Sequence, residues 1–264
     1  MTKKKVTGWQ RDAVISADRL IRGIAVRWLM VINLLVFIYV GLPFLAPVLL
    51  VNGFTGPANA IYTAYGFVCH QFAFRSWYMY GDQIAYPRER APSNLASFES
   101  YVADDPHFAG IDVTSLDNDL VFAARSFHGN EHTGYKVAFC QRDVAIYGGI
   151  LVAGLVFGLV RGRVRPLTFW QYVLLGIVPM GLDGISQLLA NPPFDELGYG
   201  AFTLLGQLSQ GVFGIRESTP MLRTLTGFLF GVANAWLAYP YIEESMQETR
   251  EKAEKQLSKA GLSV

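Results

Sequence analysis

The chain has 264 residues, of which 52% are hydrophobic and only 16% are charged, with a formal net charge of +1. Soluble domains average about 25% charged residues, so this deficit argues against a soluble protein and indicates a surface that faces lipid. The net charge itself decides nothing, because the charges are segregated along the chain. We expect one compact membrane domain and no nucleic-acid partner.

Four apolar segments are long enough to cross a membrane, since a hydrocarbon core of roughly 30 Å needs about 20 apolar residues in a helix. The predicted spans cover about 28–51, 143–160, 167–190 and 221–241. The first span follows a long polar stretch and lacks a small-residue cleavage site. We therefore expect a retained anchor rather than a cleaved signal peptide.

A fifth apolar segment, 58–80, is interrupted by polar side chains. We interpret this segment as an interfacial or re-entrant helix that does not span the bilayer. The predicted fold class is therefore all-α, a polytopic membrane helical bundle of four transmembrane helices with this additional helix. A polar extracytoplasmic insert is expected over about 82–136.

Basic residues predict the orientation of the spans. The segment 1–27 carries seven Lys or Arg residues, including Lys3, Lys4 and Lys5, and the link 161–165 reads Arg-Gly-Arg-Val-Arg. Both segments should be cytoplasmic by the positive-inside rule. The segment 52–142 holds nine acidic and six basic residues, as expected of an exported loop. The resulting organisation is a basic cytoplasmic segment (1–27), a membrane domain (28–241) and a charged cytoplasmic tail helix (242–264).

This topology places the polar residues that are hardest to accommodate in lipid at one level. Asp183 follows Leu167 by 16 residues, which is roughly 24 Å from the cytoplasmic face at 1.5 Å per residue. An ionisable group within a span is costly and implies a partner, and the candidates are Arg142 and Arg223. A helix clamp and a ligand pocket both fit this pattern. The predicted polar cluster comprises Cys69, His70, Gln71, Arg75, Cys140, Arg142, Asp183, Gln187 and Arg223.

The two cysteines, Cys69 and Cys140, allow three interpretations. On the exported side a disulfide between them is chemically reasonable, and it would close a loop of about 70 residues. A metal or haem site that also uses His70 is the second, since thiolate and imidazole ligate zinc, copper or iron. Two unlinked thiols are the third. We favour no metal or cofactor and assign no catalytic residue.

Four short motifs follow one another along the apolar part of the chain. They are Cys69-His70-Gln71 with Arg75-Ser76, then Cys140 and Arg142 with Ile146-Tyr147 and Gly149, then Pro179 with Asp183-Gly184 and Gln187, and finally Arg216-Glu217-Ser218-Thr219 with Arg223 and Thr226-Gly227. This series resembles an uncharacterised prokaryotic membrane-protein family, a domain of unknown function. The resemblance implies a polar centre of Cys69, His70, Arg75, Arg142, Asp183, Gln187 and Arg223 but supplies no activity.

The chain departs from the family's pattern at three places. An insert of about 84–136 separates the first two motifs, and the stretch 72–74 lacks the proline often found after Cys-His-Gln. Asp143-Val144-Ala145 stands where many members carry Cys or Asp followed by Thr-Gly, and the lack of a second Cys there argues against a metal site. The resemblance also implies a prokaryotic plasma membrane, in which our topology keeps the amino and carboxyl termini cytoplasmic.

We expect a non-catalytic binding or accessory subunit whose polar pocket lies in the outer leaflet. Its partners would be the lipid bilayer and, if a subunit occupies the pocket, another membrane protein. The competing hypothesis is a metal- or haem-dependent membrane redox enzyme that uses Cys69, His70 and Cys140. A small-solute transporter is the weaker alternative, because the sequence shows no internal repeats.

Overall fold

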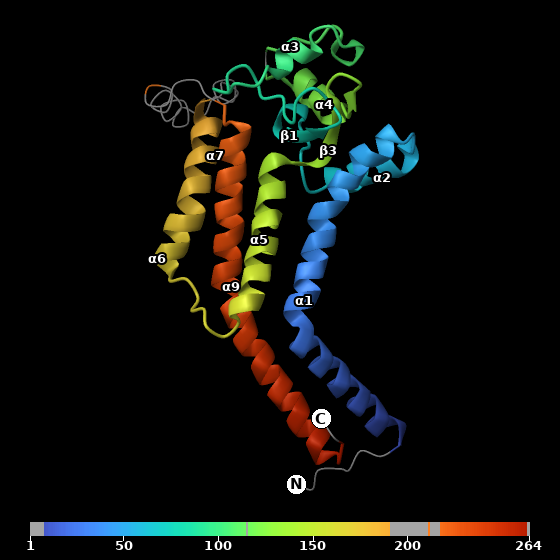
Figure 1. Ribbon diagram of the computed structural model, residues 1–264, viewed down its shortest axis with the longest axis vertical. Coiled ribbons are helices and arrows are strands. Elements are labelled where there is room, and N and C mark those ends of the chain that lie inside the picture. Colours follow the sequence, from blue (N-terminus) through green and yellow to red (C-terminus); the bar gives the residue numbers. More distant parts are fainter. Residues whose placement is uncertain (1–7, 115, 191–210, 212–216, 263–264) are drawn as a thin grey trace.

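Long helices dominate the computed structural model, which describes residues 8–114, 116–190, 211 and 217–262. Predictions that concern Lys3, Lys4, Lys5 and Arg216 fall outside the described residues. The principal helices lie side by side in the order α7, α9, α5 and α1 (Figure 1). Their bounds are Trp9–Val51 for α1, Gln141–Val160 for α5, Val178–Ala190 for α7 and Pro220–Lys259 for α9.

Among the described residues, α1 and α5 are the two helices long and apolar enough to cross a membrane by length and composition. The third predicted span is helical but divided into α6 (Phe169–Tyr172), a π-helical turn (Val173–Ile177) and α7. Pro179 explains the division, because it has no N–H to donate and its ring clashes with the carbonyl four residues earlier. A π-turn accommodates such a break without ending the helix.

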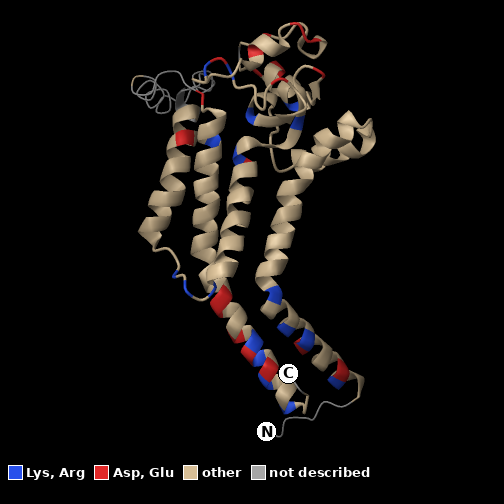
Figure 2. Cartoon of the chain, viewed as in Figure 1, with Lys and Arg blue, Asp and Glu red and all other residues tan. Residues whose placement is uncertain are grey.

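Both terminal helices extend further than predicted. α1 begins at Trp9 instead of residue 28, and α9 continues past residue 241 to Lys259, so the expected separate tail helix is its continuation. Charged residues gather where α1 begins and α9 ends (Figure 2), and we call this the termini end. The Arg22 Nε to Glu254 Oε1 distance there is 3.0 Å, so an ion pair joins the two helices.

The opposite end, which we call the insert end, carries a small sheet, so the all-α prediction was wrong in this part. The sheet is antiparallel with strand order β1-β3-β2. The strands are β1 (Ser76–Met79), β2 (Gly129–Asn130) and β3 (Gly134–Cys140). The predicted helix over 58–80 is also corrected: α2 covers Thr55–Gly66 only, and the chain then turns and enters β1.

Short helices complete the insert around a buried aromatic core. They are α3 (Phe98–Val102), the 3₁₀ turn η2 (Pro106–Phe108) and α4 (Asn118–Ser126). Lys136 of β3 is fully buried, and its Nζ donates to the carbonyls of Gln71 at 2.8 Å and of Arg125 at 2.7 Å. Burial lowers the pKa of Lys136 to about 7. This side chain therefore ties the sheet to the end of α4 and to the Cys-His-Gln turn.

Helices α5 and α9 approach each other through glycines. A Cβ added at Gly149 would lie 2.6 Å from the Phe228 carbonyl oxygen, and one added at Gly231 would meet the Ile146 carbonyl. Small residues at such positions let helices in lipid pack backbone against backbone. Gly149 and Gly231 thus serve packing within one bundle.

Two adjacent glycines of α5 provide a matched test of this contact. Gly149→Ala should lower the free energy of unfolding of the detergent-purified protein by about 1–3 kcal/mol, because the added methyl overpacks the interface. Its melting temperature should fall accordingly. Gly148→Ala should be neutral or slightly stabilising, since nothing lies within 4 Å of its added Cβ and alanine favours helix. Equal melting temperatures for the two variants would contradict the predicted close contact.

Candidate functional site

A polar cavity of about 240 Å³ lies at the insert end. It is lined by Val68, Cys69, His70, Gln71, Phe72, Arg75, Cys140, Arg142, Asp143, Gln187 and Arg223. Eight of the nine residues in the predicted cluster are in this lining, and the ninth, Asp183, contacts the lining residue Arg142. Segments far apart in the sequence therefore meet here.

The turn that follows α2 brings the Cys-His-Gln motif to the cavity. Gln71 adopts a left-handed backbone conformation with φ of 54°, which is uncommon for a residue other than glycine. Its side-chain Nε2 donates to the Tyr62 carbonyl at 2.9 Å, and its own carbonyl accepts from Lys136. These buried hydrogen bonds offset the backbone strain and fix the position of Cys69.

A buried carboxylate joins two arginines from different elements. Glu217 Oε1 accepts from Arg223 Nη2 at 2.9 Å and from Arg75 Nη2 at 3.2 Å, while the Glu217 and Arg223 side chains are only 4% and 3% exposed. The Gln187 amide adjoins all three, and in one of its two orientations its oxygen accepts from both guanidinium groups. The role of Glu217 was missed, although a buried arginine beside lipid requires a carboxylate.

Asp183 pairs with Arg142, one of the two partners predicted for it. The Arg142 Nη2 to Asp183 Oδ2 distance is 2.5 Å, and the Asp183 side chain is 2% exposed. This contact joins the first turn of α5 to α7. Within the described part of the chain, the buried Nε of Arg142 has no hydrogen-bond partner.

The two cysteines lie next to each other and are free thiols. Cys69 Sγ accepts from the backbone N–H groups of Gln71 at 3.4 Å and of Cys140 at 3.3 Å. The Cys140 thiol donates to Asp143 Oδ2 at 3.0 Å. Its hydrogen bond with Cys69 and its burial raise the pKa of the Cys140 thiol. The disulfide between the two cysteines stays a prediction.

His70 is exposed at the cavity, and its ring lies 5.3 Å from that of Phe72. Among the described residues, the group that places three ligand atoms within 4.8 Å of one another is Cys69, Cys140 and Asp143. Asp143 thus takes the place that the redox hypothesis gave to His70. The sequence signal for this was present, because Asp143 follows Cys140 by three residues at the start of a helix.

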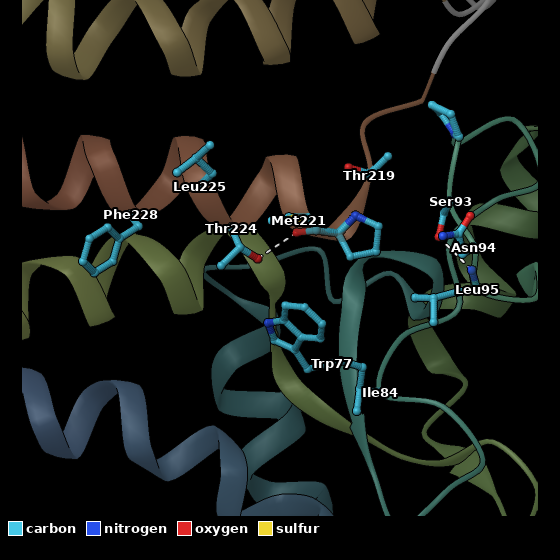
Figure 3. A pocket seen from close by; sticks show the side chains of 12 residues that line it. Trp77, Ile84, Ser93, Asn94, Leu95, Thr219, Met221, Thr224, Leu225 and Phe228 are labelled. Atoms are coloured by element: carbon cyan, nitrogen blue, oxygen red, sulfur yellow. Dashed lines mark hydrogen bonds between the residues drawn. The ribbon is translucent and has the colours of Figure 1, made fainter.

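A larger cavity of about 670 Å³ lies beside the polar one but differs in character. Figure 3 shows Trp77 and Ile84 on one side of it and Leu225 and Phe228 of α9 on another. None of the described residues that line it has an ionisable side chain. We therefore place the chemistry in the smaller cavity.

Comparison with known proteins agrees with the motifs. Residues 123–237 match a family described as predicted membrane protein (DUF2085). This match covers less than half of the chain. The DUF2085 region contains Cys140, Arg142, Asp183, Gln187 and Arg223 but begins after the Cys-His-Gln turn. The resemblance seen in the sequence is therefore confirmed, and contact with a lipid bilayer follows from it.

A relative from Methanocaldococcus jannaschii is described as uncharacterized protein MJ1492. It is 26% identical over 113 residues, which are 42% of this chain and 56% of the relative. The chain thus spans little more than half the length of this relative. No solved structure matches the chain.

Proposed function

We propose that four helical segments cross the bilayer: α1, α5, the α6–α7 segment and the first half of α9. Large apolar side chains are exposed on each of them, which suits contact with lipid and not with water. Examples are Phe37 at 60% exposed, Leu155 at 58%, Leu182 at 62% and Leu225 at 52%. In α9 the apolar half ends near Glu243, where the charged part begins.

The termini end is proposed to face the cytoplasm of a prokaryotic cell. Basic residues stand at the α1 start, and others stand in the 161–165 link, which lies farther along the molecule at the base of α5 and α6 (Figure 2). Short basic loops remain on the cytoplasmic side. The insert, with its acidic excess, then lies outside. This orientation places the polar cavity at the outer face of the plasma membrane.

Cysteine labelling in intact cells tests this orientation. In a Cys69→Ser/Cys140→Ser background, a membrane-impermeant maleimide should label Ser93→Cys in the insert without permeabilisation. Arg163→Cys, in the 161–165 link, should be labelled only after the membrane is opened. Labelling of Arg163→Cys in intact cells would contradict the proposed orientation.

The function that the polar cavity supports best is binding of a small oxyanion, that is, a carboxylate or a phosphate. Three guanidinium groups line the cavity, against the single carboxylate of Asp143. The carboxylates of Asp183 and Glu217 contact these arginines without lining the cavity. Planar guanidinium forks match carboxylate and phosphate oxygens in geometry.

The Nε of Arg142, which has no partner among the described residues, carries this proposal. A buried donor without a partner is unfavourable by about 1–3 kcal/mol, and an anionic oxygen in the cavity would satisfy it. Glu217 contacts both Arg75 and Arg223, and Asp183 contacts Arg142. The three arginines are therefore paired with two carboxylates. A binding or accessory role requires only that these arginines hold an anion, and it requires no residue pair that transfers a proton.

Thermal unfolding of the full chain in detergent tests anion binding, with sodium acetate and inorganic phosphate as probes. At least one of the two anions should raise the melting temperature more than sodium chloride does at equal ionic strength, and the rise should reach a plateau with concentration. A ligand that binds the folded state stabilises it in this way. Arg75→Gln should weaken that binding at least tenfold. We choose Arg75 because Glu217 keeps Arg223 as its partner in this variant.

The exposed Arg90 of the insert provides the matched control. Arg90→Gln carries the same charge change and should leave the anion response unaltered. Two results would refute the proposal: no shift with either anion, or an equal loss of binding in Arg90→Gln and Arg75→Gln.

A further inference from the structure

We propose that Cys69, Cys140 and Asp143 form a binding site for a divalent cation of the zinc type in the wall of the polar cavity. The three ligand atoms all lie within 4.8 Å of one another. Around a tetrahedral zinc ion with Zn–S bonds of about 2.3 Å, ligand atoms lie about 3.5–3.8 Å apart. Small side-chain rotations therefore suffice to close the site.

The backbone around the two sulfur atoms suits thiolate ligands. The N–H groups of Gln71 and Cys140 point at Cys69 Sγ, and the Asp143 N–H donates to Cys140 Sγ at 3.4 Å. Cys140 also caps the 20-residue helix α5, whose N-terminus favours negative charge. Backbone donors of this kind offset part of the free energy that burial adds to a thiolate.

The chemistry of the ligand set selects the ion. Thiolates favour zinc and copper(I) over magnesium or calcium, and the added carboxylate favours a divalent ion over copper(I). On binding, the cation takes the place of the two thiol protons, which leave to solvent. Two thiolates and a carboxylate then leave one net negative charge around the ion, close to the guanidinium groups of the same cavity.

Three protein ligands leave a fourth coordination position, as in zinc sites that bind water or a substrate. All three ligands line the polar cavity, so that position faces the cavity. The assignment goes beyond the proposed anion binding, because the arginines do not depend on the ion. It also differs from a site that uses His70, which lies outside the three-ligand group.

Metal titration of the reduced full chain in detergent tests the site. Cobalt(II) should give thiolate charge-transfer absorption at one equivalent, and zinc should displace it. Cys69→Ser, Cys140→Ser and Asp143→Asn should each weaken binding at least tenfold. These replacements are close to isosteric, and an unchanged melting temperature in the absence of metal will show that each variant is folded.

Matched controls separate this site from its alternatives. His70→Ala and Asp104→Asn, an exposed carboxylate of the insert, should bind cobalt as the parent chain does.

Three results would overturn the proposal. They are less than one tenth of an equivalent of cobalt in the reduced parent chain, undiminished binding in Asp143→Asn, or loss of binding in His70→Ala. Alkylation at cell lysis adds a check on the native state: a Cys69–Cys140 disulfide throughout the population would also overturn it.

Discussion

At Gly149, Gly227 and Gly231 the backbones of α5 and α9 lie against each other with no side chain between them. A Cβ added at Gly227 would lie 2.7 Å from the Arg142 carbonyl oxygen, so the first turn of α5 lies beside the first turns of α9. This contact holds Arg142 and Arg223 at one level of the bundle. The paired carboxylates of Asp183 and Glu217, and the cavity that the arginines line, depend on that alignment.

Burying these charged side chains is unfavourable in free energy unless each is paired. Removing one partner of a buried ion pair typically destabilises a protein by about 3–5 kcal/mol, whereas replacing the whole pair by apolar residues is often neutral. Several such pairs at one level suit the proposed binding site better than a purely stabilising role. Glu217 joins Arg75 of the turn before β1 to Arg223 of α9, so the same contacts also attach the insert to the helices.

Much of the site was readable from the sequence because lipid makes polar residues conspicuous. Asp183 and Arg142 stood out against apolar surroundings, and the sequence already named each as a partner for the other. The sheet could not be foreseen, since β1 pairs with β3 across an insert of more than fifty residues. In addition, neither strand shows a clear alternation of polar and apolar residues in its sequence. Glu217 and Asp143 were left out of the predicted cluster, although each lies close in sequence to a cluster residue near the start of a helix.

A double-mutant cycle on Arg142→Gln and Asp183→Asn tests most directly whether distant segments converge at one polar level. The free energy of unfolding of the parent chain, both single variants and the double variant would be measured in detergent. We predict a coupling energy of about 1.5–3 kcal/mol, as expected for residues in direct contact. Effects that add within about 0.5 kcal/mol would show that the two residues do not meet, and would contradict the assembled cavity.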